Sequence, residues 1–529
     1  MARQRAAAVA SKSAGKSLAV LNDLPVMDVC PWRYWATHSP QAVALRTESD
    51  TLSWQQLAHY VAQRAAYLAE CGVSEGCAVA LIGRNSPALL LNYLAVMECG
   101  ARVVPVNPQL PRERQVALCA ALDVRFGIAM PATDGEMNAE PAVVDAFDSA
   151  GVEMLTASLL FSVQLFSVDA AHSASSAANN ALEVSPVVAV APVAWDAMRP
   201  ATVTLTSGSG GLPKGVVHSA ACHLASADGL LQMLPFTAHD SWLLSLPLFH
   251  VSGQGIVWRW LLRGATLVCR PLRDLAQALQ GCSHASLVPT QLYRLLQQPQ
   301  SLPSLRQVLL GGAVIPVALT QQAQAAGIHC WCGYGMTEMA STVTAKAADS
   351  RSGVGLCLPR RELCLRDEEV WVRGAPLALG YWRDGALQPL TNDQGWFATR
   401  DRGCMRDGEL VILGRLDNLF ISGGENIQPE QIERGLALHP QVLQAFVLPV
   451  ADAEFGQRPV AVLQFNSSSD TACDASAVAD DLRSWAKTHL AGFQRPLHYF
   501  CLPDGFGGGG IKIARKAVAD WLASGPPPL

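Results

Sequence analysis

Residues 206–214 (TSGSGGLPK) have the composition of a loop that holds a polyphosphate. Three glycines allow the backbone to turn and to approach a ligand with its amide groups exposed. Ser207 and Ser209 can donate hydrogen bonds to phosphate oxygens, and Lys214 adds a positive charge. An apolar segment, residues 202–205, leads straight into the loop, which a flexible Gly/Ser turn would not need. Glycine rather than Ser or Thr follows the lysine, so the loop is not of the Walker A type.

A second motif, residues 333–338 (GYGMTE), follows an apolar segment, residues 328–332, that we expect to form a strand. Tyr334 can stack on a purine ring. Thr337 can donate a hydrogen bond to a phosphate, and Glu338 offers a hard oxygen ligand for Mg²⁺, which prefers one or two carboxylates in addition to phosphates. Alone, such a string is also compatible with a plain turn. After a phosphate loop earlier in the chain, it indicates a nucleotide site.

The elements that must position these motifs follow an alternating pattern. Residues 53–71 have apolar side chains at helical spacing after an N-cap serine, and residues 87–99 form a second helical pattern that ends before Gly100. Residues 77–82 and 101–106 are short apolar runs of the buried-strand type. Strand, helix and strand in this order predict a parallel sheet covered by helices.

The chain divides into regions of different composition. Residues 1–25 are basic and lack a continuous apolar segment, so we expect a disordered tail rather than a secretory signal. Residues 26–414 carry the alternating pattern, except that residues 128–200 are rich in Ala, Ser and Val and are expected to form a variable, surface-exposed insertion. Residues 415–529 have the length of a small α+β domain. In this last region we expect helices at residues 430–437 and 477–490 and a strand at residues 442–450.

The composition argues against several classes of protein. Of the 529 residues, 50% are hydrophobic and 16% are charged, which favours a globular chain with a large core. The net charge of −5 argues against a generally basic nucleic-acid-binding protein. The longest apolar segment, residues 154–168, is shorter than the roughly 20 residues of a membrane-spanning helix. The 15 cysteines are scattered without a CxxC pair, so we expect reduced cysteines in a cytoplasmic protein.

Five motifs in a fixed order make the chain similar to the adenylate-forming enzymes, which include acyl- and aryl-CoA ligases, peptide-synthetase adenylation domains and luciferases. The family has a TSGSTGxPK loop, a YGxTE motif, a ribose-binding Asp, a GRxD hinge and a C-terminal Lys, which here correspond to residues 206–214, residues 334–338, Asp401, residues 414–417 and Lys512. The resemblance implies an α/β fold, in which a large multi-layer N-terminal domain with mixed, largely parallel sheets precedes a small mobile α+β domain. It also implies the use of ATP, Mg²⁺ and coenzyme A: a carboxylate attacks ATP to give an acyl adenylate, and the thiol then displaces AMP.

The same resemblance assigns roles to individual residues. The catalytic residues would be Lys512, Thr337, Glu338 and Lys214, with Glu338 also the ligand of Mg²⁺. The ATP site would comprise Thr206, Ser207, Gly208, Ser209, Gly210, Gly211, Lys214, Gly312, Ala313, Gly333, Tyr334, Thr337, Asp401, Arg415 and Lys512. The small domain would rotate about Asp417 between the two half-reactions and open a thiol channel lined by Ser422, Gly423 and Gly424.

Two positions depart from the family pattern. Gly210 stands where the family has Thr, which removes a hydroxyl donor and predicts a weaker grip on the nucleotide. A lost hydrogen bond to a charged group is worth about 1.5–3 kcal/mol. The ribose motif reads Thr399-Arg400-Asp401 where the family often has Thr-Gly-Asp, with the Asp retained.

Three further stretches, residues 242–255, 284–292 and 510–513, resemble one branch of the family, whose acid carries two carboxylates. The acid pocket would be formed by His250, Ser252, Gly253, Gln254, Arg259, Pro289 and Thr290. Arg259 lies in a hydrophobic run, where an unpaired cation is costly, so it pairs either with a structural carboxylate or with an anionic ligand. His250 either gates the pocket or is a satisfied core histidine.

Three other functions remain open at this point. The first is a ligase of the same fold that acts on another aryl or acyl acid. The second transfers the adenylate to a carrier protein, which we expect to be a separate partner. The third is a catalytically impaired nucleotide-binding protein, suggested by Gly210 and the long insertion. Against it stands the joint retention of Lys214, Glu338, Asp401 and Lys512. The expected partners are small molecules rather than nucleic acid, and the sequence leaves open whether the chain forms a homo-oligomer.

Overall fold

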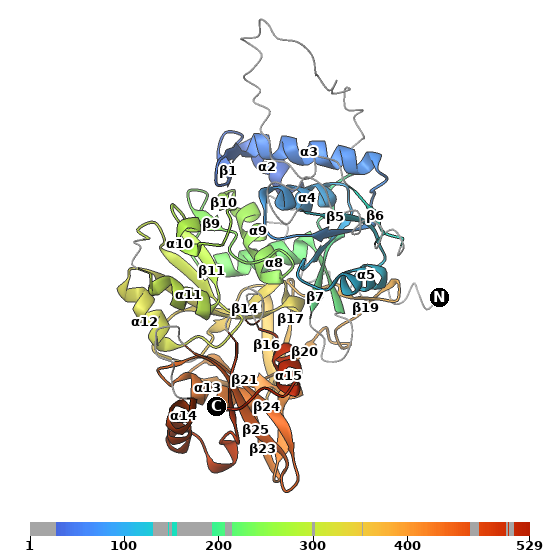
Figure 1. Cartoon of the computed structure of the whole chain (residues 1–529). Coiled ribbons are helices and arrows are strands. Elements are labelled where there is room, and N and C mark those ends of the chain that lie inside the picture. Colours follow the sequence, from blue (N-terminus) through green and yellow to red (C-terminus); the bar gives the residue numbers. More distant parts are fainter. Residues whose placement is uncertain are drawn as a thin grey trace, which may run out of the picture.

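In the computed structural model, two large sheets and their helices form the main body, and a smaller C-terminal part lies below them in Figure 1. The structure describes residues 28–130, 147, 151–155, 193–206, 214–298, 302–351, 353–465, 475–503, 506 and 513–529.

The first large sheet has eight strands in the order β19-β18-β8-β7-β4-β3-β5-β6. In that order they are Ala386–Gln388, Gly380–Arg383, Lys214–Ser219, Pro200–Thr206, Arg102–Val106, Ala78–Ile82, Val124–Ala129 and Glu153–Met154. Neighbours from β7 to β6 pair in parallel, whereas β8 pairs with β7 in the antiparallel sense. Strands β3 and β4 are buried along their whole length, as expected for parallel strands that are covered on both faces.

The second large sheet has nine strands in the order β15-β14-β13-β12-β11-β9-β10-β1-β2. In that order they are Leu356–Cys357, Ser341–Ala347, His329–Met336, Gln307–Leu310, His284–Leu287, Ser241–Leu243, Thr266–Val268, Val43–Arg46 and Thr51–Ser53. Neighbours from β13 to β1 pair in parallel, and the strands at both edges are antiparallel. The helices α10 (Leu275–Ala278), α11 (Pro289–Leu296) and α12 (Val317–Ala325) connect its strands.

Helices cover and separate the sheets (Figure 1). The helices α8 (Ala220–Leu231) and α9 (Val251–Arg263) lie at the centre of the main body, and α8 is buried along its whole length. Among the described residues, the other helices of the main body are α2 (Pro31–His38), α3 (Trp54–Glu70), α4 (Pro87–Glu98) and α5 (Arg112–Ala121). Ser53 caps α3 in a capping box with Gln56, which explains why this helix begins where the sequence predicts.

A four-stranded antiparallel sheet leads from the main body to the C-terminal part. Its strands are β16 (Arg361–Arg366), β17 (Glu369–Gly374), β20 (Phe397–Arg406) and β21 (Glu409–Arg415). The 3₁₀ turns are η2 (Thr337–Met339), η3 (Leu416–Asn418) and η4 (Gly492–Gln494). The C-terminal part contains β22 (Phe420–Ser422), β23 (Glu425–Ile427), α13 (Pro429–Ala437), β24 (Val442–Asp452), β25 (Gly456–Phe465), α14 (Ala475–His489), β26 (Tyr499–Cys501) and α15 (Arg515–Ala523).

The structure confirms the predicted alternation and corrects two details. Strand β13 does not end before the second motif but continues to Met336, so Tyr334 lies within a strand. Part of the region predicted to be a surface insertion, residues 128–200, belongs to the core instead: β5 ends at Ala129, β6 pairs with it, and Phe147 is fully buried. The described residues 193–200 are mostly exposed or half-buried, and the rest of the region lies outside the described residues. Apolar side chains in this region therefore complete the core of the eight-stranded sheet, which an Ala/Ser-rich composition conceals.

Within the described part of the chain, no helix is long and apolar enough to cross a membrane. The described cysteines are all free, and most of them are buried.

Candidate active site

The two ends of the predicted phosphate loop are held by an antiparallel hairpin. Thr206 at the end of β7 pairs with Lys214 at the start of β8. The predicted phosphate-binding residues between them lie outside the described residues: Ser207, Gly208, Ser209, Gly210 and Gly211. Because the flanking strands belong to a buried sheet, the loop starts and ends at fixed points.

Tyr381 contacts both Lys214 and Glu338, and the three residues come from three different elements. The Nζ atom of Lys214 lies 5.0 Å from the centroid of the Tyr381 ring. The Tyr381 hydroxyl donates a hydrogen bond of 2.9 Å to Oε1 of Glu338, in the turn η2. Burial and the negative charge of Glu338 raise the pKa of Tyr381. Sequence reasoning did not single out Tyr381, because a lone tyrosine in β18 carries no motif.

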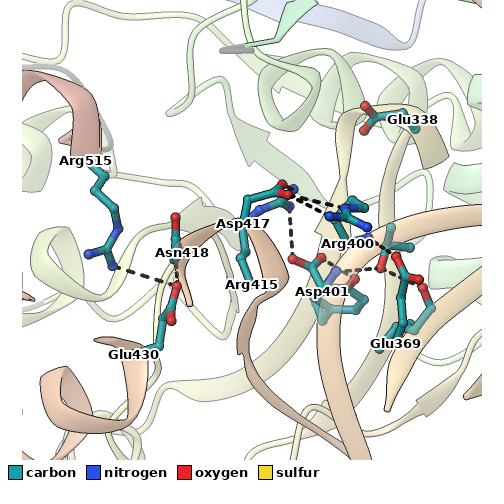
Figure 2. Close-up of polar contacts among 12 residues, drawn as sticks. Glu338, Glu369, Arg400, Asp401, Arg415, Asp417, Asn418, Glu430 and Arg515 are labelled. Atoms are coloured by element: carbon teal, nitrogen blue, oxygen red, sulfur yellow. Dashed lines mark hydrogen bonds and ion pairs between the residues drawn. The ribbon is translucent and has the colours of Figure 1, made fainter. Parts of the chain in front are cut away.

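Tyr334 and Arg415 both contact Asp401, the residue predicted to bind ribose. The Tyr334 hydroxyl donates to Oδ2 of Asp401 at 2.6 Å. Nη1 of Arg415 donates to Oδ1 of Asp401 at 3.0 Å (Figure 2). Burial and the neighbouring carboxylate raise the pKa of Tyr334 well above its usual value, so its hydroxyl stays a donor. A carboxylate has about four acceptor positions, so Asp401 can still accept hydrogen bonds from a ligand.

A bulge in β20 explains how Asp401 reaches this position. Residues 399–401 all oppose the single residue Val370, between the pairs Ala398–Trp371 and Arg402–Glu369. Arg400 has φ of +65°, a left-handed conformation that costs a non-glycine residue roughly 1–2 kcal/mol. The glycine found here in many family members would avoid that cost.

The predicted adenine-contacting residues follow the end of β12. Gly312 has φ of +79°, and both Gly312 and Ala313 are exposed. In the neighbouring strand β13, Gly333 lies close to the backbone of Thr344, with which an added Cβ would be in contact at 3.5 Å. The carboxyl ends of the parallel strands β12 and β13 therefore lie side by side where the sequence predicts the adenine base.

Arg259 is a buried cation on α9. Its side chain donates a hydrogen bond of 3.2 Å to Oγ of Ser286 and lies 4.7 Å from the ring centroid of Trp242. Only 2% of the residue is exposed, and burial lowers its pKa to about 9. In the described part of the chain, no carboxylate forms an ion pair with it, so the structural-carboxylate alternative lacks a partner.

Two other residues predicted to line the acid pocket, Gln254 and Gly253, are buried in contacts within the fold. Gln254 is fully buried, and its amide donates to Oγ1 of Thr204 and to the carbonyl of Leu248, both at 3.0 Å. Gly253 is packed so tightly that a Cβ would lie 2.1 Å from the carbonyl oxygen of Pro247. Gln254 and Gly253 therefore have structural contacts that the sequence did not predict.

His250, Ser252, Pro289 and Thr290 lie at the starts of two helices. His250 is the N-cap of α9 and is exposed, so the alternative that it is a core histidine is wrong. Ser252 is partly buried in the first turn of the same helix. Pro289 is buried and Thr290 is half-buried in the first turn of α11.

The predicted hinge and thiol-channel residues follow β21. Asp417 lies in η3, where Nη2 of Arg415 donates to it at 3.1 Å. Ser422 ends β22, and Gly423 and Gly424 have φ of +56° and +87° in the tight turn to β23. A Cβ on Gly423 would lie 2.6 Å from the Phe455 ring, so a larger residue here would require that ring to move. Lys512 lies outside the described residues.

The carboxylate of Glu338 suits a Mg²⁺ ion that is bound by phosphate oxygens at the same time. Within the described ranges, no group of three or more His, Cys, Asp or Glu side chains could hold a metal ion by itself. Glu338 presents one partly buried carboxylate, and Tyr381, which is uncharged itself, contacts both this carboxylate and Lys214 at the end of the phosphate loop. This arrangement matches the preference of Mg²⁺ for one or two carboxylates plus phosphate oxygens and water.

Comparison with known proteins gives the same family as these motifs. The family model described as AMP-binding enzyme matches residues 32–382, and the model described as AMP-binding enzyme C-terminal domain matches residues 431–504. The chain belongs to the AMP-binding enzyme family. It is 48% identical to the 2-succinylbenzoate–CoA ligase of Salmonella typhimurium over 93% of this chain and 97% of that protein. The 2-succinylbenzoate–CoA ligase of Escherichia coli K12 is also 48% identical, over 93% of this chain and 98% of that protein.

Solved structures confirm the predicted fold class. An Arg-to-Lys variant of E. coli MenE with bound OSB-AMS has a TM-score of 0.78 and 45% identity, and the match covers 94% of this chain and 98% of that one. The anthranilate CoA ligase AuaEII, in complex with anthranoyl-AMP, also has a TM-score of 0.78, over 96% of this chain and all of that one. Its identity is only 19%, so that likeness concerns the fold alone.

Proposed function

We propose that this protein is an ATP-dependent acid–thiol ligase of menaquinone biosynthesis. It converts 2-succinylbenzoate and coenzyme A to 2-succinylbenzoyl-CoA, AMP and pyrophosphate through an acyl adenylate. Relatives of that name at 48% identity support the assignment. The observation that carries it is the buried guanidinium of Arg259, which has no carboxylate partner in the described part of the chain. A diacid needs such a cation for the carboxylate that is not activated.

In the first half-reaction, charge neutralisation is the main catalytic problem, because a carboxylate attacks an anionic phosphate. We assign Lys214 and the loop before it to the β- and γ-phosphates, and Thr337 to the α-phosphate. Glu338 would hold Mg²⁺, which supplies positive charge to the phosphates when bound. Lys512 would contact the carboxylate and the α-phosphate.

The nucleotide is positioned by residues of the second large sheet and the four-stranded sheet. The ring of Tyr334 would stack on adenine while its hydroxyl holds Asp401, which accepts hydrogen bonds from the ribose hydroxyls. Arg415 fixes the second carboxylate oxygen. Gly312 and Ala313 would pass the edge of the base. We further propose that residues 26–414 and 415–529 act as two domains.

In the second half-reaction, the thiol of coenzyme A attacks the acyl carbonyl and AMP leaves. We propose that the C-terminal domain turns about Asp417 and that the turn at Ser422, Gly423 and Gly424 lines the path of the thiol. We place the enzyme in the cytoplasm, an assignment that the free cysteines support.

The acid specificity can be tested with two monoacids matched to the diacid. 3-Benzoylpropionate keeps only the chain carboxylate, and 2-butyrylbenzoate keeps only the ring carboxylate. We expect mass spectrometry to detect a thioester and AMP with 2-succinylbenzoate, and far less product with either monoacid. Efficient turnover of benzoates or fatty acids instead would select another aryl- or acyl-CoA ligase. A folded protein that releases no pyrophosphate with any acid would indicate an impaired nucleotide-binding protein.

A further inference from the structure

The connection between the main body and the C-terminal part is short and exposed. Strand β21 ends at Arg415, and the turn η3, which has no buried residue, leads to β22. Several contacts across this connection are polar: Arg402 donates to Gln428 at 2.9 Å, and Arg434 donates to the carbonyls of Ile412 and Leu413. An interface of this kind does not fix the relative orientation of two units as an apolar core would. Individual ion pairs at the connection can therefore shift the populations of the orientations.

Arg400 forms such an ion pair. Its Nε and Nη2 atoms donate to Oδ1 of Asp417 at 3.3 and 3.2 Å, from the bulge of β20 to the middle of η3 (Figure 2). The other carboxylate oxygen of Asp417 accepts from Arg415 at 3.1 Å. Two cations thus hold one carboxylate of the connection.

The backbone of Arg400 is anchored within the four-stranded sheet, which precedes the connection in the chain. Its N–H donates to Oε1 of Glu369 in the neighbouring strand at 2.9 Å, and it lies between Thr399 and Asp401 of the ribose motif. The residue keeps a left-handed conformation with φ of +65°, which glycine would adopt without strain. An arginine in this conformation costs conformational free energy that glycine would not. Its side chain therefore has to make a contact that glycine cannot make, and the structure shows that contact with Asp417.

We propose that Arg400 is a positioning residue that latches Asp417, so that the Arg400–Asp417 ion pair stabilises the orientation of the C-terminal part described here. The consequence for catalysis rests on the proposed two-step reaction, because each half-reaction would use its own orientation. When the two parts turn about η3, Asp417 moves relative to β20 and the pair breaks. The latch therefore sets the ratio between this orientation and the others.

The latch can be tested by measuring the distance between the two parts, which requires neither acid nor coenzyme A. Spin labels on noncanonical amino acids at the exposed positions Gln322 in α12 and Lys487 in α14 report that distance by electron double resonance. The wild-type protein should populate the distance of the present orientation. For an exposed ion pair, Arg400→Gly should lower the ratio of this population to the others by roughly twofold to fivefold.

Two controls separate the ion pair from other effects of the substitution. Asp384→Gly replaces another exposed residue of positive φ (+51°), in the β18–β19 turn, and should leave the distance distribution unchanged. High salt should lower the population in the wild type and not in Arg400→Gly, because salt screens exposed pairs. A distribution in Arg400→Gly equal to that of the wild type, or a wild type that lacks the present distance, would overturn the latch. Neither result would bear on the acid that the enzyme activates.

Discussion

The hydroxyl of Tyr334 and the carboxylate of Asp401, 67 residues apart in the chain, are joined by a hydrogen bond of 2.6 Å. Tyr334 lies in β13 of the nine-stranded sheet and Asp401 in β20 of the four-stranded sheet. This bond connects the residue proposed to stack on adenine with the residue proposed to hold ribose. The proposed nucleotide site is thus held in one arrangement by the protein itself, which would reduce the entropy lost on binding ATP.

Tyr334→Phe tests this alignment, because it keeps the ring and removes the donor. A hydrogen bond to a charged group is worth about 1.5–3 kcal/mol, so we expect the KM for ATP to rise by roughly tenfold or more. The KM for the acid should stay unchanged, and both constants come from initial rates of pyrophosphate release. An unchanged KM for ATP would mean that Arg415 alone is enough to orient Asp401.

Arg259 is expected to set the affinity for the diacid. Because the substitution removes a desolvated charge pair, Arg259→Met should raise the KM for 2-succinylbenzoate by roughly tenfold or more and leave the KM for ATP unchanged. The matched comparison is a monoacid, for which the variant and the wild type should have similar KM values. An unchanged KM for the diacid would remove Arg259 from the pocket.

Gln254 is expected to stabilise the fold rather than to bind the acid. Its amide donates hydrogen bonds to Oγ1 of Thr204 and to the carbonyl of Leu248. Gln254→Leu leaves these two buried acceptors unsatisfied, and each unsatisfied acceptor costs about 1–3 kcal/mol. We expect urea denaturation to give a lower free energy of unfolding, with little change in the KM for the diacid. A tenfold rise in that KM at unchanged stability would instead place Gln254 in the acid pocket.

Lys512 is expected to act in the first half-reaction only. Lys512→Ala should abolish adenylate formation and affect thioester formation from supplied adenylate far less, as measured in separate single-turnover assays. Lys516→Ala, in the exposed first turn of α15, is the matched control and should behave as the wild type. Equal losses in both half-reactions would contradict the proposed domain rotation.

Gly210 offers a substitution that should improve the enzyme. Gly210→Thr supplies the hydroxyl that the family has in the phosphate loop. If the hydroxyl reaches a phosphate, its hydrogen bond to a charged group should lower the KM for ATP by about tenfold. A KM for ATP equal to that of the wild type would show that the backbone amides already satisfy the phosphates.

The sequence predicted those parts of the site whose signal is local. The phosphate loop, Tyr334, Asp401 and Arg415 stand in short motifs, and capping and periodicity located α3 and β3. Tyr381 was missed because its contact with Glu338 joins residues from distant elements. The latch residue Arg400 was noticed as a departure from the family, but its partner Asp417 emerges only when the bulge of β20 is seen. Phe147 and β6 escaped prediction because sheet pairing, not composition, makes them part of the core.

The most direct test of the proposed function is pyrophosphate release with ATP and Mg²⁺, measured for 2-succinylbenzoate beside a panel of benzoates and fatty acids, with and without coenzyme A. We predict that 2-succinylbenzoate is strongly preferred and that coenzyme A allows continuous turnover with AMP formed in equal amount. Turnover with other acids and none with the diacid would contradict the assignment, while leaving the fold and the two-step chemistry in place.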